Sequence, residues 1–270
     1  MFISHLRPKR NAAPELCETL PLPVCDSAQQ EKLSIEAIFT GYSVEVVDPE
    51  SIKKLCLNGG FGQGLYARAF PACVTNPSET VRKSKRTIGS LAGQHDPARD
   101  NSNNCEPLSL FLEEAFFLMH KLNILKLRTI YGKPLSVAEA FERFRQVKKD
   151  FVAGYCGYLY LKAKNWVVKS GIKFGGDFVI YVKGPQFYHA SYIVLIREML
   201  HGKLHSNAYT VDGLDFQGFN RVAETTAKDI LFLEVHYPDS DLPSLERLQD
   251  VRVGETFTKH HNYIAGRNQQ

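Results

Sequence analysis

The chain has 270 residues, a formal net charge of +4, and 44% hydrophobic and 23% charged residues. This length suits one large domain or two modest ones, and the composition is that of a globular protein rather than a disordered or membrane-embedded one. No apolar run approaches the roughly 18 residues that span a bilayer, and the first residues lack the apolar core of a secretory signal. The small excess of positive charge permits a nucleic-acid partner without requiring one.

The six cysteines are widely and irregularly spaced, and no Cys-x-x-Cys pair occurs. This spacing argues against a structural zinc site. Because no signal sequence is apparent, we expect reduced thiols in a cytosolic or nuclear setting.

The first part of the chain changes character twice. Residues 1–34 are rich in proline and polar residues, so we expect a flexible arm. Residues 35–75 read as a small α/β segment, with alternating strands followed by the short helix "PESIKKLCLNGG". Pro49 would lie in the first turn of this helix and Gly59 just past its end.

The glycine-rich stretch "GGFGQG" (residues 59–64) suggests a phosphate-binding loop. However, no Lys-Ser/Thr pair follows it and no strand-to-helix switch frames it, so a flexible turn between helix and strand is favoured. Residues 76–106 are polar and aperiodic, which predicts a linker. Its basic run "RKSKR" (82–86) could be a nuclear address or a phosphate contact, or only a solvated charge run.

Residues 107–150 predict the helical remainder of the N-terminal domain. Apolar residues recur at helical spacing over 108–123, and Ser136 and Glu139 have the spacing of a capping box that starts the next helix. Residues 151–270 predict a second domain, in which a helix is followed by strands, a further helix and more strands. The whole pattern predicts an α+β fold with a mixed, largely antiparallel sheet packed by helices.

The candidate catalytic residues lie in "DFVIYVKGPQFYHASY" (177–192) and in the segment after it. We expect a hairpin with a tight Gly-Pro connection that carries Tyr181 on one arm and His189 on the other. We place Lys228 on the following helix, on the same face as Arg221, because seven residues make two helical turns.

This set of residues suits metal-independent cleavage of RNA through its own 2′-hydroxyl group. Histidine titrates near neutral pH and can act as acid or base, and lysine can stabilise charge on the phosphate oxygens. A phenol ionises near pH 10, so Tyr181 needs nearby cations such as Lys228 to act as a base, or else it orients the hydroxyl. Taken singly, each residue also has an ordinary interpretation as a strand tyrosine, a structural histidine or a solvated lysine.

The stretch "NWVVKSGIKFGGDFVIYVKGPQFYHASYIVLI", with "NRVAETTAKDILFLEV" after it, resembles the tRNA-intron endonuclease family. The matching blocks together cover roughly residues 40–75, where the likeness is weaker, and 107–265. The resemblance implies a C-terminal nuclease domain, after a small N-terminal α/β domain, and a catalytic subunit that cuts the 5′ splice site of intron-containing pre-tRNA. The products would be a 2′,3′-cyclic phosphate and a 5′-hydroxyl group, made without a metal or other cofactor.

The resemblance also implies roles for single residues. Tyr181 would be the general base, His189 the general acid and Lys228 the cation that stabilises the transition state. Arg221 matches a family arginine that clamps a flipped nucleotide. The family's second clamp is a tryptophan, and His261 stands near that place here, with Tyr263 close by.

The family works in eukaryotes as an assembly of four subunits, in which a catalytic subunit of this kind is joined by a second catalytic subunit and two structural subunits. The resemblance therefore implies those partners, a pre-tRNA substrate and a nuclear location, or the cytoplasmic face of mitochondria as in some fungi. A non-catalytic RNA-binding subunit of the same complex is the main alternative. A metal enzyme built on His201 and His205 ("HGKLH") and a plain protein-interaction module are the others.

Overall fold

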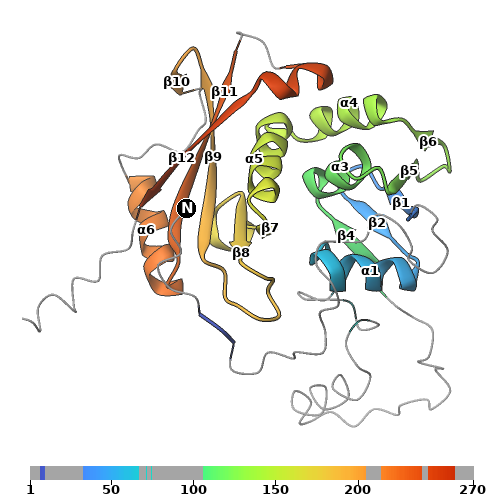
Figure 1. The fold of residues 1–270 in the computed structure, drawn as a ribbon, viewed down its shortest axis with the longest axis horizontal. Helices are drawn as coiled ribbons and strands as arrows, with labels where there is room; N and C mark the ends of the chain where they lie inside the picture. The colour runs from blue at the N-terminus through green and yellow to red at the C-terminus, as the bar shows by residue number, and fades with distance from the viewer. Residues whose placement is uncertain are drawn as a thin grey trace, which may run out of the picture. The chain divides into compact units, whose positions relative to one another are not determined.

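The structure is a computed structural model that describes residues 7–9, 33–66, 71, 74, 106–204, 214–238 and 243–258. The chain divides into two compact units (Figure 1). The N-terminal unit comprises Glu15–Ala140, and the C-terminal unit comprises Met1–Pro14 together with Phe141–Gln270. Within the described part of the chain, no helix has the length and apolar character needed to cross a membrane.

The N-terminal unit contains a six-stranded sheet in the order β3-β4-β2-β1-β5-β6. Strands β1 and β5 are parallel, and the other neighbours are antiparallel. Among the described residues, two helices belong to this unit and another begins at its end. The elements are β1 (Ile35–Phe39), β2 (Val44–Val46), α1 (Pro49–Gly59), β3 (Gln63–Gly64), β4 (Leu108–Leu110), α3 (Leu112–His120), β5 (Leu125–Thr129), β6 (Pro134–Leu135) and α4 (Val137–Val147).

Helix α1 has clear start and stop signals. The side chain of Asp48 accepts a hydrogen bond from the Ser51 amide at 2.9 Å, which satisfies one free N–H of the first turn. Gly60 ends the helix in the left-handed region, at φ 63°, so the helix runs one residue further than expected and includes Gly59. The glycine-rich stretch then leads from α1 into β3, as the turn interpretation predicted.

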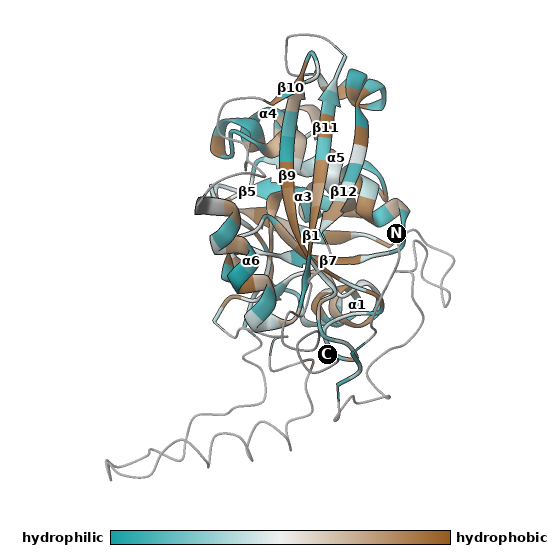
Figure 2. Ribbon diagram, turned by 90° about the vertical axis from the view of Figure 1, so that its left-hand side faces the viewer, coloured by the Kyte–Doolittle hydropathy of each residue, from teal (hydrophilic) through white to brown (hydrophobic). Residues whose placement is uncertain are grey.

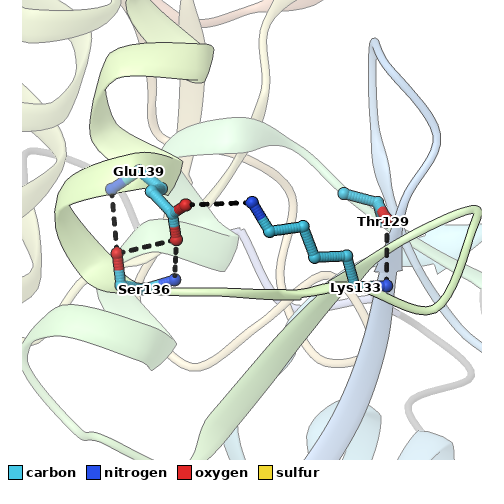
Figure 3. A network of polar contacts seen from close by, with 4 residues as sticks. All are labelled: Thr129, Lys133, Ser136 and Glu139. Atoms are coloured by element: carbon cyan, nitrogen blue, oxygen red, sulfur yellow. Dashed lines mark hydrogen bonds and ion pairs between the residues drawn. The ribbon is translucent and has the colours of Figure 1, made fainter.

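The start of α4 is the capping box that the sequence predicted (Figure 3). The amide of Ser136 donates to Glu139 Oε2 at 2.9 Å, and the amide of Glu139 donates to Ser136 Oγ at 3.2 Å. Lys133 Nζ lies 3.5 Å from Glu139 Oε1. The bonds from Ser136, more than the charge of Lys133, lower the pKa of the Glu139 carboxyl group.

One predicted helix starts later than expected. Residues 108–110 form β4, which pairs with β2 through Val44 and Leu110, and α3 begins only at Leu112. The reason is that Leu108 and Leu110 alternate inward around the half-buried Ser109, which is the period of a strand.

The C-terminal unit contains the second six-stranded sheet, in the order β12-β11-β9-β8-β7, with β10 beside β9. Strands β9 and β11 are parallel and the other pairs are antiparallel, which confirms the mixed, largely antiparallel sheet. The elements after α4 are α5 (Phe151–Ala163), β7 (Val167–Ser170), η2 (Ile172–Phe174), β8 (Phe178–Tyr181), β9 (Tyr192–Leu200), β10 (Lys203–Leu204), α6 (Leu214–Thr226), β11 (Asp229–Tyr237), η3 (Leu245–Asp250) and β12 (Arg252–Thr258).

Helices α5 and α6 cover opposite faces of this sheet (Figure 1). Gly157 of α5 faces Ile196 of β9, whereas Ala223 of α6 belongs to a buried cluster that contains the neighbouring Leu195. Successive side chains of a strand point to opposite faces, so the two helices must lie on different sides. Hydrophobic and hydrophilic residues alternate along α6 (Figure 2), as expected for a helix with one side against a sheet.

Candidate active site

The topology of the C-terminal sheet brings three chain segments to one edge. Because β8 and β9 are antiparallel while β9 and β11 are parallel, the end of β8 and the starts of β9 and β11 lie together. The amide of Ser191 donates to the carbonyl oxygen of Ile180 at 2.9 Å, and the amide of Asp229 donates to the carbonyl oxygen of Ser191 at 3.2 Å. Tyr181 follows Ile180 and Lys228 precedes Asp229. The two residues therefore flank Ser191 across the sheet, each one position beyond a hydrogen bond to it.

Tyr181 is the last residue of β8 and is half-buried. It packs against the same cluster of apolar side chains that α6 covers, which includes Val179, Ile193 and Leu195. Burial raises the pKa of its phenol above the ordinary value of 10.0. At neutral pH the side chain is thus a neutral phenol, and only a small fraction is phenolate.

His189 lies in the connection between β8 and β9, not on a hairpin arm. The prediction of a tight Gly-Pro hairpin was wrong, because β8 ends at Tyr181 and β9 begins only at Tyr192. Within the connection the amides of Phe187 and Tyr188 both donate to the carbonyl oxygen of Gly184 at 3.2 Å, so the ladder does not continue there. The His189 side chain is exposed, and the residue lies two positions before Ser191.

Lys228 lies outside α6, so its predicted place on that helix was also wrong. The helix ends at Thr226, and Ala227 takes the left-handed conformation at φ 53°. The amide of Ala227 donates to the carbonyl of Glu224 at 3.1 Å, and the amide of Lys228 to that of Ala223 at 2.9 Å. This pair of bonds is a Schellman motif in which alanine occupies the usual glycine position.

The ammonium group of Lys228 is held over an aromatic ring. Its Nζ lies 4.4 Å from the ring centroid of Phe174 and donates to the carbonyl oxygen of Thr226 at 3.1 Å. Phe174 packs against the same apolar cluster as Tyr181. Burial, and secondarily the positive charge of Arg7, lower the pKa of Lys228 below its ordinary value of 10.5.

The hydrogen bonds that join this edge do not involve Arg221, a further predicted site residue. Arg221 is exposed on α6, and because the helix stops at Thr226, its seven-residue spacing no longer places it on one helix face with Lys228. His261 and the nearby Tyr263 lie outside the described residues.

The alternative metal site also lacks support in the described residues. His201 sits in the turn between β9 and β10 at φ 50°, and its predicted partner His205 is outside the described part. In the residues that the structure describes, no group of three His, Cys, Asp or Glu side chains could hold a metal ion.

Sequence reasoning missed two residues at this edge. Phe174 stands in the quoted "GIKFGG" stretch, but nothing in the sequence indicates that its ring carries the Lys228 ammonium group. Arg7 belongs to the segment interpreted as a flexible arm, and its carbonyl oxygen accepts a hydrogen bond from the His189 amide at 3.1 Å. The only sequence signal there was the basic stretch "RPKR".

Comparison with known proteins shows what the C-terminal part of this chain is similar to. Residues 151–259 match the family described as tRNA intron endonuclease, catalytic C-terminal domain. The match contains Tyr181, His189 and Lys228, and also Arg221. Over these residues the family match confirms the resemblance.

The more particular similarity is to subunits named Sen2. The chain is 35% identical to the tRNA-splicing endonuclease subunit Sen2 of Gallus gallus over 158 residues, which cover 56% of this chain and 33% of that protein. Its identity to the Saccharomyces cerevisiae subunit SEN2 is 33% over 138 residues, or 43% of this chain and 35% of that protein. A tRNA-splicing endonuclease of Saccharolobus islandicus is 32% identical over 107 residues, which cover 40% of this chain and 58% of that protein. The chain thus spans about a third of the length of its eukaryotic Sen2 relatives.

Proposed function

We propose that this chain is the catalytic subunit of a tRNA-splicing endonuclease that cleaves pre-tRNA at the 5′ splice site of the intron. The observation that carries the proposal is the shared sheet edge, where Tyr181, His189 and Lys228 are gathered inside the matched residues 151–259. The three side chains supply a proton acceptor, a proton donor and a cation, which are the groups that RNA self-cleavage needs.

In the proposed reaction the 2′ oxygen of the RNA forms a bond to the neighbouring phosphorus, and the bond from phosphorus to the 5′ oxygen breaks. Tyr181 takes up the proton of the 2′-hydroxyl group, and His189 gives a proton to the departing 5′ oxygen. Lys228 stabilises the negative charge that builds on the other phosphate oxygens. The products are a 2′,3′-cyclic phosphate and a 5′-hydroxyl end.

The raised pKa of Tyr181 limits how it can act in this scheme. The phenol is neutral at rest, so proton uptake has to come from the small ionised fraction, and the step it controls should speed up as pH rises. The lowered pKa of Lys228 has a different consequence, since the cation is lost at a lower pH than an ordinary lysine. Cleavage should therefore decline on the strongly alkaline side.

The proposal extends to substrate and partners. Arg221 and His261 would hold a flipped nucleotide near the cut, with a weaker clamp than the family's arginine and tryptophan provide. A second catalytic subunit and two structural subunits would complete the enzyme, and the nucleus would be its location. The name of the relatives, tRNA-splicing endonuclease subunit Sen2, supports the partner subunits and the tRNA substrate in this extension.

The test uses the full chain reconstituted with those partner subunits, an intron-containing pre-tRNA, and EDTA in the buffer. We compare wild type with His189→Asn, and use His201→Asn as the matched control, because it makes the same change at an exposed histidine at the far end of β9. Asparagine tolerates the left-handed conformation of His201.

The expected result is loss of only the 5′ cut in His189→Asn, with normal cutting by the control and a cyclic phosphate on the wild-type product. Unchanged 5′ cutting by His189→Asn would refute the proposal and leave the chain as a non-catalytic subunit. Cutting that needs a divalent metal ion would refute the metal-independent mechanism.

A further inference from the structure

The N-terminal residues Arg7–Lys9 are bound to the connection that carries His189. Pro8 forms an isolated antiparallel bridge with Tyr188. The amide of Lys9 donates to the carbonyl oxygen of Phe187 at 2.7 Å, and the amide of His189 donates to the carbonyl oxygen of Arg7 at 3.1 Å. A segment nearly 180 residues away in sequence therefore fixes the backbone on both sides of Tyr188.

The same segment brings a second positive charge to the site. Arg7 and His189 are both exposed. The positive charge of Arg7 contributes to lowering the pKa of the Lys228 ammonium group. Arg7 is thus linked to the candidate acid by a backbone hydrogen bond and to the candidate cation by its charge. Two cations held near each other repel, and an anion bound beside both would relieve that repulsion.

We propose that Arg7 is a further substrate-binding residue, whose guanidinium group contacts a phosphate of the RNA strand at the cleavage site while its carbonyl oxygen positions His189. This inference rests on the proposed function and adds to it the substrate group that Arg7 binds. Guanidinium groups suit this task because their planar donors match the oxygens of a phosphate. Arg7 and Lys228 would hold the strand from two sides of one phosphate-binding edge.

The first experiment compares Arg7→Ala and Arg7→Lys with Lys203→Ala in the reconstituted complex. Lys203 is the matched control, because it is an exposed cation of the same unit beyond the other end of β9, roughly 25–30 Å from Ser191 along the strand. We expect Arg7→Ala to slow single-turnover 5′ cutting by about 10- to 100-fold, the usual effect of losing a charged hydrogen bond. Arg7→Lys should recover part of the rate, and Lys203→Ala should cut normally.

Binding gives a readout that a purely structural role would not change. A pre-tRNA with a 2′-deoxy residue at the cut site binds without being cleaved, so its affinity can be measured at several salt concentrations. Arg7→Ala should reduce the slope of log affinity against log salt by about 0.7–0.9, the value for one lost phosphate contact. An unchanged slope would overturn phosphate binding by Arg7.

A second pair of variants tests the backbone placement. Lys9→Pro removes the N–H group that bonds to the Phe187 carbonyl, whereas Lys9→Ala keeps it and removes only the side chain. We expect Lys9→Pro to lose more activity than Lys9→Ala, because it releases the segment that carries Arg7. Equal activity of the two variants would overturn the placement.

The two proposals fail in different ways. If Arg7→Ala cuts like Lys203→Ala while His189→Asn is inactive, the role of Arg7 is refuted and the proposed function stands. If His189→Asn cuts the 5′ site like wild type, the proposed function is refuted, and the role of Arg7 in it falls as well.

Discussion

The ammonium group of Lys228 lies 4.4 Å from the ring centroid of Phe174, and Phe174 packs against the same buried cluster as Tyr181. The aromatic ring therefore links the candidate cation to the core on which the candidate base rests. The ring also favours the charged form of Lys228, whereas burial and the positive charge of Arg7 disfavour that form. The position of Lys228 is thus set by packing and backbone geometry rather than by an exposed helix face.

Replacing Lys228 with methionine should separate activity from stability. We expect 5′ cutting to fall roughly 100- to 1,000-fold, since one preorganised charge at a reacting phosphate is lost. The melting temperature should stay equal or rise, because the folded state already disfavours the charged form of this lysine. Lys203→Met, at an exposed site on β10, should leave both quantities unchanged. A large drop in melting temperature for Lys228→Met would instead indicate a structural role.

Replacing Tyr181 with phenylalanine should remove proton uptake and keep the packing. We expect a loss of about 100- to 10,000-fold in 5′ cutting with little change in stability, because the ring still fills its place in the apolar cluster. In wild type, the phenolate fraction grows tenfold per pH unit below the raised pKa of Tyr181. With a substrate that needs no general acid, the cutting rate should follow that slope, and a rate independent of pH would show that Tyr181 only orients the hydroxyl.

Ala227 offers a test of the helix end that places Lys228. Alanine is strained at its φ of 53°, so Ala227→Gly should raise the free energy of unfolding by about 0.5–1 kcal/mol. The same substitution at Ala138, an exposed residue in the first turn of α4, should lower that free energy instead. Denaturant titration measures both, and destabilisation by Ala227→Gly would contradict the Schellman motif.

Because of Glu139, the stability of the folded protein should depend on pH in the acidic range. Hydrogen bonds from Ser136 lower the pKa of the Glu139 carboxyl group in the folded state. The carboxylate therefore stabilises the folded protein fully at pH values above its ordinary pKa of 4.5, and this stabilisation is lost as the pH falls through the lower pKa of the folded state. Glu139→Gln should therefore lower the melting temperature at pH 7 and have less effect at pH 3. Glu142→Gln, which removes a carboxylate paired with Arg145 but outside the cap, is the control. An effect of Glu139→Gln that is equal at both pH values would contradict this account.

Much of the fold was predictable because its signals are local. The capping box before α4, the apolar run of α5 and the alternation in β1 are written within a few residues. The predicted domain limits, including a flexible arm over residues 1–34, remain predictions, although Arg7–Lys9 of that segment are paired with the His189 connection.

The parts that sequence reasoning missed depend on residues far apart or on an unusual residue at a signal position. The sequence predicts a helix that continues through Lys228, because alanine, not glycine, occupies the left-handed position at residue 227. The sequence predicts a tight hairpin, because nothing in it reveals that Arg7–Lys9 pair with residues 187–189. Non-local hydrogen bonds of this kind leave no pattern in a window of sequence.

The most direct test of the central claim uses a pre-tRNA in which sulfur replaces the 5′ leaving oxygen at the 5′ splice site. A thiolate departs without receiving a proton, so the need for a general acid disappears. If His189 is that acid, His189→Asn should cut the sulfur substrate at nearly the wild-type rate while it fails on the normal one, and Tyr181→Phe should remain slow on both. Equal impairment of His189→Asn on both substrates would contradict the assignment of His189 as the acid.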